Sequence, residues 1–194
     1  MQVLGISGSL REGSHNKQLL EAASSELPPG VTLDLFEGLE DVPAFREDLE
    51  REPPPGARAF LDAIDHADAL LFATPEYNSS VPGALKNALD WASRPFPDNV
   101  LRDKPAAVVG ASTGLFGAVW AQAELRKILT ASGARVLDDE LPVGHAPEAF
   151  DDEGRIAAPD TAERLRDILA SLVAQAEQLR MATEGARAAG GGLS

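Results

Sequence analysis

The chain has 194 residues, 44% of them hydrophobic and 25% charged, which is the length and composition of one soluble globular domain. It contains no cysteine and only three histidines, which excludes disulfides, thiolate catalysis and cysteine-ligated metal centres and argues against a histidine-rich metal site. Asp and Glu number 31 against 17 Lys and Arg, and the resulting formal charge of -14 disfavours nucleic acid and anionic membranes as partners.

No apolar run approaches the roughly 20 residues that cross a bilayer, and the first residues lack the basic-then-apolar pattern of a signal peptide. We therefore expect a cytoplasmic protein that has no membrane partner.

The chain begins with a short apolar run, Val3–Ile6, which predicts a buried strand, and residues 14–26 carry apolar side chains at helical spacing. The polar, glycine-punctuated stretch from Gly5 to Asn16 joins the two, with Ser14 as the predicted N-cap. Unpaired backbone N–H groups and the positive end of a helix dipole favour anions at such a turn. Hydroxyl donors at Ser7, Ser9 and Ser14 and the planar fork of Arg11 suit phosphate oxygens.

This first loop predicts a site for one terminal phosphate. It lacks the third glycine of the dinucleotide fingerprint and the Gly-Lys-Ser/Thr of nucleoside triphosphate loops. Because the chain is so acidic, Arg11 and Lys17 must dominate the local field if a phosphate binds. The alternative is an ordinary strand-to-helix turn with a surface arginine, and His15 is interpreted as a solvated first-turn residue.

The rest of the chain alternates strands and helices in the same way. Apolar runs bounded by turn residues predict strands, and apolar residues three and four apart predict helices. The predicted order is an edge strand at 31–36, a helix at 57–66, a strand at 67–73, a helix at 85–91, a strand at 106–111, a helix at 118–132, a strand beginning at 135–137 and a helix at 161–181.

This alternation predicts an α/β fold, an open parallel sheet with helices on both faces. Ligands of such sheets sit beyond the carboxyl ends of the strands. Three polar loops, at 5–16, 74–83 and 112–117, all follow strands and should share that edge. We expect a single domain over residues 1–182 and a flexible tail at 183–194, where Gly and Ala occur without periodicity.

The second and third loops offer groups that suit a planar, hydrogen-bonding ring. Pro75-Glu-Tyr-Asn78 places a flat aromatic group between side chains that donate and accept hydrogen bonds. Ser112-Thr-Gly114 provides groups for the other side of the same ring. The alternative for the second loop is a structural turn, with Glu76 a solvated charge and Tyr77 a core or interface residue.

Together, these motifs resemble the NADPH-dependent FMN reductase family, which includes quinone, chromate and azo-dye reductases. The resemblance rests on Gly8–Asn16, on Pro75–Asn78 with the following Ser80–Trp91, and on Ser112–Gly117, and it covers about residues 1–143. It implies a flavodoxin-like three-layer sandwich whose five-stranded parallel sheet has the order 2-1-3-4-5. It also implies FMN at the point where the strand order reverses, and homodimers or homotetramers.

The same resemblance implies which residues bind the cofactor. Because a flavin would do the chemistry itself, we expect no catalytic side chain, and the composition predicts no metal site. Ser9, Arg11, Ser14 and Asn16 would hold the FMN phosphate. Pro75, Glu76, Tyr77 and Asn78 would contact the isoalloxazine ring, chiefly through backbone groups and Asn78, and Ser112, Thr113 and Gly114 would line its other edge. The helix Lys86–Trp91 resembles the family's subunit contact; core packing of Leu85, Leu89 and Trp91 is the alternative.

One departure concerns the third loop, where many relatives have a double glycine and an arginine and this chain has Gly117-Ala-Val-Trp120. Loss of the arginine removes a contact to the dinucleotide or to the partner subunit. The choice between NADPH and NADH therefore stays open.

The activity implied is transfer of hydride from NADPH or NADH to FMN and onward to a small-molecule acceptor such as a quinone, by a ping-pong mechanism. The alternative is an FMN-binding electron carrier or regulatory module without nicotinamide turnover. It ranks second because a chain with 5% aromatic residues is poorly equipped to sandwich a flavin between aromatic rings. A third possibility is a doubly wound domain that binds no flavin.

Overall fold

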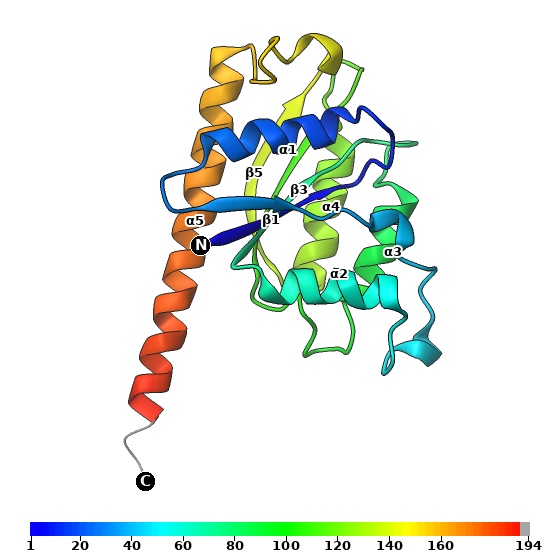
Figure 1. The fold of residues 1–194 in the computed structure, drawn as a ribbon, viewed down its shortest axis with the longest axis vertical. Helices are drawn as coiled ribbons and strands as arrows, with labels where there is room; N and C mark the ends of the chain where they lie inside the picture. Colours follow the sequence, from blue (N-terminus) through cyan, green and yellow to red (C-terminus); the bar gives the residue numbers. More distant parts are fainter. Residues whose placement is uncertain (191–194) are drawn as a thin grey trace.

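Five parallel strands form one sheet within residues 1–190, the part of the chain that this computed structural model describes (Figure 1). The strands lie in the order β2-β1-β3-β4-β5, so the predicted order is confirmed. Their bounds are Gln2–Ser7 for β1, Thr32–Leu35 for β2, Ala69–Ala73 for β3, Pro105–Ala111 for β4 and Arg135–Val143 for β5.

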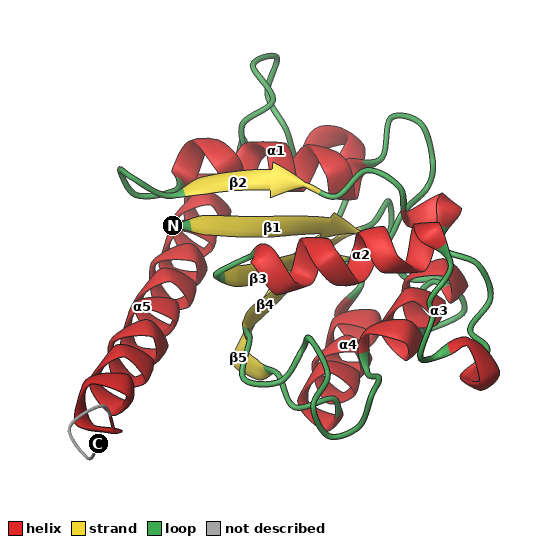
Figure 2. Cartoon of the chain, turned by 60° about the horizontal axis from the view of Figure 1, so that its bottom comes forward, coloured by secondary structure: helices red, strands yellow, loops and turns green. Residues whose placement is uncertain are grey.

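Helices cover both faces of the sheet, giving the predicted three layers (Figure 2). Along β3, Leu70 and Phe72 join the core beneath one helix layer, whereas Ala69 and Leu71 join the core beneath the other. That alternation explains why the central strands are apolar throughout. One layer consists of α1 (His15–Glu26) and α5 (Pro159–Gly190), and the other of α2 (Pro55–His66), α3 (Gly83–Ala92) and α4 (Val119–Ala131).

The edge strand β5 is longer than the sequence pattern predicts, nine residues where only the first three were apparent. Asp138, Asp139 and Glu140 interrupt its apolar pattern, and an irregularity in the pairing with β4 falls beside them. Charged side chains fit here because an edge strand reaches solvent, and Glu140 pairs with Arg126 of α4 at 2.9 Å.

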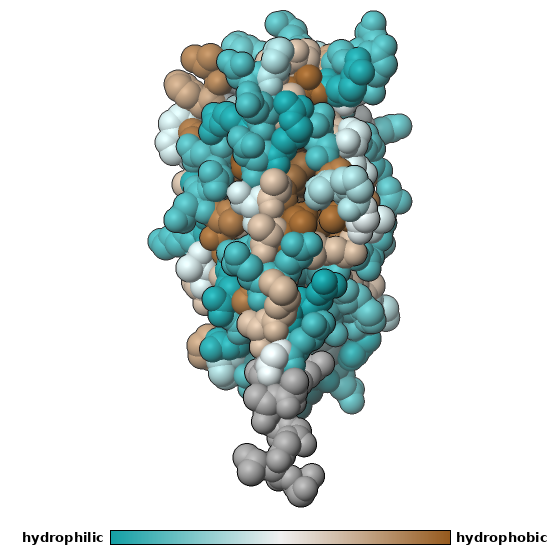
Figure 3. Space-filling model, turned by 90° about the vertical axis from the view of Figure 1, so that its left-hand side faces the viewer, coloured by the Kyte–Doolittle hydropathy of each residue, from teal (hydrophilic) through white to brown (hydrophobic). Residues whose placement is uncertain are grey.

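Helix α5 is also longer than predicted. Its buried residues end at Ala176, and the turns up to residue 185 are almost entirely exposed where the helix extends past the sheet (Figure 1). On this side of the molecule most visible side chains are hydrophilic (Figure 3). The domain boundary at residue 182 and the flexibility of 183–194 stay predictions, and residues 191–194 of that tail lie outside the described residues.

The helix that follows β3 packs into the core. Leu85, Leu89 and Trp91 of α3 are all buried, and the Trp91 Nε1–H donates to the carbonyl of Pro43 at 2.8 Å. Trp91 also packs edge-on against Phe45, with ring centroids 5.0 Å apart. Core packing thus accounts for these three side chains. Among the described residues, no helix is long and apolar enough to cross a bilayer.

Candidate functional site

The three polar loops lie together at the carboxyl edge of the sheet, as predicted, because β1, β3 and β4 run parallel. A hydrogen bond of 2.8 Å from Gly8 N to the carbonyl of Ala73 ties the first loop to the end of β3. Another, of 3.0 Å, runs from Thr74 N to the carbonyl of Val109 and ties the second loop to β4. The edge is therefore one continuous surface.

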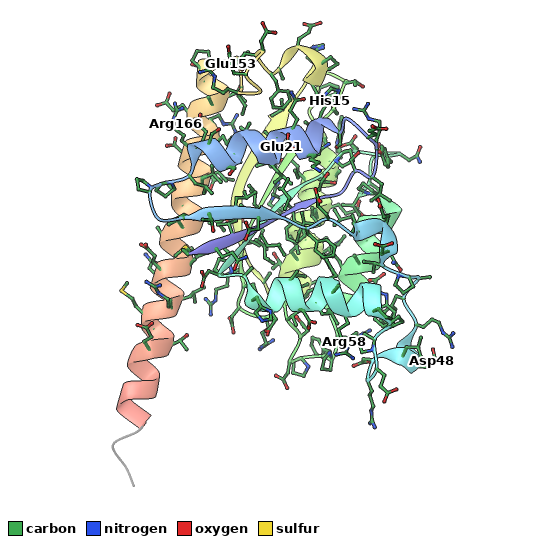
Figure 4. All side chains as sticks on the ribbon, in the orientation of Figure 1. His15, Glu21, Asp48, Arg58, Glu153 and Arg166 are labelled. Carbon is green, nitrogen blue, oxygen red and sulfur yellow. The ribbon has the colours of Figure 1, made fainter. Side chains whose placement is uncertain are left out.

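A hollow of about 210 Å³ opens between these loops. Nine of the eleven predicted site residues line it, and Asn78 and Gly114 are the two that do not. His15, labelled in Figure 4, is half-buried at the start of α1 and also lines the hollow, so it is not the fully solvated residue expected. The lining predicted residues are Ser9, Arg11, Ser14, Asn16, Pro75, Glu76, Tyr77, Ser112 and Thr113.

The first loop has several hydrogen-bond donors, and five of its residues line this hollow. Ser14 is the N-cap of α1, as predicted, and its Oγ accepts from the N–H groups of Asn16 and Lys17 at 3.2 and 3.3 Å. Within the described residues, the backbone N–H groups of residues 10–15 have no protein acceptor. The guanidinium of Arg11 donates to the carbonyl of Gly13 at 2.7 Å, which holds the loop closed. The loop therefore has the free donors and positive charge that an anion needs.

A second hollow, of about 400 Å³, lies on the other side of the same loop, and Ser9, Arg11 and Ser14 border both. Its far wall is the segment Phe36–Glu40 after β2. There Lys17 pairs with Glu37 at 2.7 Å, which raises the pKa of Lys17 and lowers that of Glu37. Because Lys17 has a carboxylate partner, Arg11 is the main positive charge at the loop.

Asn16 uses its side chain inside the protein. Its Nδ2 donates to the carbonyl of Ala111 and its Oδ1 accepts from the N–H of Ala111, both at 2.9 Å. Asn16 is almost completely buried, and this pair joins the first turn of α1 to the end of β4. Sequence reasoning assigned Asn16 to the phosphate; the contacts indicate that it positions the third loop, which starts at Ser112.

The second loop is a tight turn. The backbone groups of Tyr77 and Ser80 exchange two hydrogen bonds of 3.1 Å, and Asn78 and Ser79 between them have φ values of 54° and 60°. Both residues are in the left-handed region, as in a type I′ turn, which Asn tolerates well. The turn leaves the Tyr77 side chain 51% exposed, so Tyr77 is not a core residue.

Glu76 is not a free, solvated charge, which was the alternative interpretation of this residue. Its Oε2 accepts from the backbone N–H groups of Trp120 and Ala121, at 3.0 and 3.1 Å. These groups belong to the first turn of α4, whose own N-cap, Ala118, has no side-chain acceptor and a φ of 60°. Glu76 therefore caps a helix 44 positions along the chain, where a carboxylate also benefits from the helix dipole.

The third loop is held by the end of β5. Gly117 has a φ of 55°, and a Cβ there would lie 2.3 Å from the backbone of Pro142. The side chain of Gln122 is fully buried; its Nε2 donates to the carbonyl of Gly117 at 2.9 Å and its Oε1 accepts from the N–H of Leu141 at 3.1 Å. Sequence reasoning missed Gln122. A polar residue on the buried side of a predicted helix was the available signal.

The assembled site has hydrogen-bond donors at one end and an exposed aromatic ring beside a tight turn at the other. That arrangement fits an anion attached to a flat ring system. Among the residues that the structure describes, no group of three His, Asp or Glu side chains could hold a metal ion.

The family model for NADPH-dependent FMN reductases matches residues 1–148. An NAD(P)H-dependent FMN reductase of Pseudomonas aeruginosa is 43% identical over 182 residues, covering 93% of this chain and 97% of that protein. A 2-hydroxy-1,4-benzoquinone reductase of a Burkholderia species is 38% identical over 170 residues, covering 87% of this chain and 92% of that protein. Among solved structures, the flavoenzyme NAD(P)H:(acceptor) oxidoreductase of Paracoccus denitrificans is similar with a TM-score of 0.80 and 34% identity, covering 91% of this chain and 97% of that one.

Proposed function

The chain belongs to the NADPH-dependent FMN reductase family, and we propose that it binds FMN between its three loops and reduces a quinone with NADPH or NADH. The observation that carries the proposal is the hollow lined by nine of the eleven residues predicted to bind FMN. A quinone as the acceptor is supported by relatives that are named quinone reductases.

The residues at the first loop fit the phosphate of FMN. Ser9, Ser14 and the free backbone N–H groups of Arg11, Ser14 and His15 would donate to its oxygens, and the guanidinium of Arg11 would balance its charge. Asn16 contributes through Ala111, whose backbone it fixes beside the hollow.

The residues at the other two loops fit the ring. Pro75, Glu76, Tyr77 and Asn78 would contact it through the backbone of the turn and the amide of Asn78. Ser112, Thr113 and Gly114 would line the opposite edge. The Glu76 carboxylate fixes the relative positions of these two walls through α4.

Bound FMN would supply the redox chemistry, in which NADPH, a proton and a quinone become NADP⁺ and a hydroquinone. The protein binds, orients and supplies hydrogen-bond donors where negative charge gathers, and no side chain need act as an acid or base. One open site serving donor and acceptor in turn requires ping-pong kinetics.

Steady-state rates of the FMN-loaded protein, measured with the concentrations of NADPH and a quinone both varied, test the ping-pong mechanism. Parallel double-reciprocal lines are expected, and intersecting lines would show a ternary complex and contradict the shared site. If FMN binds but neither NADPH nor NADH is oxidised in the presence of a quinone, the electron-carrier alternative holds instead.

We also propose that the protein is a homodimer or homotetramer. The family resemblance supports this, but the contact must use surfaces other than Leu85, Leu89 and Trp91, which are buried in the core of the single chain. Light scattering from the purified protein measures the assembly; a monomer at micromolar concentration would contradict the proposal.

A further inference from the structure

Exposed apolar side chains gather at one edge of the molecule. Among the described residues, seven large hydrophobic side chains are exposed, and five of them lie on the loops at the carboxyl edge of the sheet or in the turn that follows. Such concentration marks a binding surface, because scattered exposure is the norm for apolar residues. The five are Leu10, Tyr77, Leu115, Phe116 and Trp120; the other two are Phe96 and Met181.

Phe116 and Trp120 form an aromatic pair within this set. Their ring centroids are 5.2 Å apart and their planes are inclined by 67°, an edge-to-face arrangement. Each side chain is more than half exposed, 59% for Phe116 and 51% for Trp120. The pair therefore keeps aromatic surface available to a further ring.

The pair stands on rigid backbone next to the hollow. Trp120 N donates to the carboxylate of Glu76, which itself lines the hollow. The carbonyl of Gly117, between the two aromatic residues in sequence, accepts from the buried amide of Gln122. Backbone that is held in place lowers the ordering cost of binding, which favours a rigid ligand.

The pair itself offers a ligand no positive charge. The chain carries a formal charge of -14, and Trp120 provides apolar surface without any cationic group. Arg11, the main positive charge of the site, lies on the first loop, where its guanidinium is bonded to Gly13. A neutral ligand pays least to approach this surface.

We propose that Phe116 and Trp120 form the wall on which a flat, uncharged aromatic acceptor stacks, and that they determine which acceptors this protein reduces. This inference rests on the proposed function, since the wall matters only if bound FMN delivers electrons at the hollow. The class of substrate is a quinone with fused rings, in preference to small or anionic acceptors.

Two acceptors separate stacking from electron delivery. 1,4-Naphthoquinone is flat, neutral and aromatic, whereas ferricyanide is a compact anion that cannot stack. With FMN-loaded protein at saturating NADPH, Trp120→Ala should raise the KM for naphthoquinone about five- to tenfold, as loss of one aromatic stacking contact implies. The Phe116→Ala, Trp120→Ala double variant should raise it further, with the rate for ferricyanide changed less than twofold.

Matched variants complete the design. Phe96→Ala removes an exposed aromatic ring from the loop before β4, at the opposite edge of the sheet, and should leave the naphthoquinone KM and the ferricyanide rate unchanged. Trp120→Phe keeps a ring and should retain most of the affinity. The melting temperature and the light-scattering mass of each variant are recorded beside both readouts and compared with those of the unaltered chain.

The outcomes are distinct. An unchanged naphthoquinone KM in the double variant overturns the wall while leaving the proposed function intact. A parallel loss of both activities together with a smaller assembly would show that the pair is a subunit contact and would also overturn it. If the unaltered chain reduces neither acceptor, the proposed function itself fails.

Discussion

Replacing Asn16 by alanine should destabilise the protein strongly, although this residue lines the hollow between the three loops. The substitution removes two hydrogen bonds of 2.9 Å and leaves the N–H and carbonyl of Ala111 without partners in a buried position. Each buried polar group left unpaired costs about 1–3 kcal/mol, so the free energy of unfolding should fall by roughly 2–6 kcal/mol. That is a large share of the total stability of a typical domain, about 5–15 kcal/mol.

Urea unfolding measures this loss. With a slope of about 2 kcal/mol per molar urea, the midpoint should fall by about 1–3 M. Gln18→Ala, on the same turn of α1 at a half-buried position, is the control and should change the free energy of unfolding by less than about 0.5 kcal/mol. The measurement is made with and without FMN. If Asn16→Ala unfolds at the same urea concentration as the control but binds FMN weakly, Asn16 is a phosphate ligand and our interpretation of its buried pair is wrong.

Three further predictions concern the first loop, the third loop and the segment that precedes α5. Arg11→Ala should weaken FMN binding by more than about tenfold, as loss of a charge-assisted hydrogen bond implies, in a titration followed by flavin fluorescence; unchanged affinity would remove Arg11 from the site. Gly117→Ala should lower the free energy of unfolding by about 1–3 kcal/mol, because φ is 55° and the new Cβ would lie 2.3 Å from the backbone of Pro142. Gly83→Ala is the control, since a Cβ there has no neighbour within 4 Å, and equal effects of the two substitutions would refute the steric argument. Hydrogen bonds from the backbone N–H and the guanidinium of Arg155 lower the pKa of Asp151, so its carboxylate stabilises the fold above its usual pKa of 3.8, and this contribution is lost as the pH falls through the lowered pKa. Asp151→Asn should therefore lose less stability than the unaltered chain between pH 5 and pH 2, and equal losses would contradict the lowered pKa.

The layout of the candidate site was largely predictable, because the strands, the loops after them and the helix N-cap depend on residues that are close in sequence. The apolar runs of β1, β3 and β4 identify central parallel strands, and parallel strands bring the loops after them to one edge. Ser14 follows a residue preference for helix N-caps that acts within three positions. These features depend on neighbouring residues in the sequence, so the sequence pattern is enough to predict them.

The side-chain contacts that set the site were not predictable in this way. Glu76 caps a helix 44 positions away and Asn16 pairs with backbone 95 positions away, and no local pattern encodes such distances. The pairing of Lys17 with Glu37 likewise depends on β2 lying next to β1. Contacts of this long-range kind give a residue a structural role that its local sequence does not reveal.

The predicted lengths of β5 and α5 were wrong for a related reason. Asp138–Glu140 interrupt the apolar pattern of β5, yet the strand continues because its edge position exposes them to solvent. In α5, residues 177–185 include no buried side chain, so no apolar periodicity marks this stretch. In both places exposure removes the signal on which pattern reasoning depends.

The visible spectrum of the purified protein, recorded before and after addition of NADPH or NADH, tests the central claim most directly. We expect flavin absorption bands that bleach when either nucleotide is added and return when a quinone follows. A colourless protein that takes up no FMN, or flavin bands that neither nucleotide bleaches, would contradict the assignment of this chain as an FMN-dependent reductase.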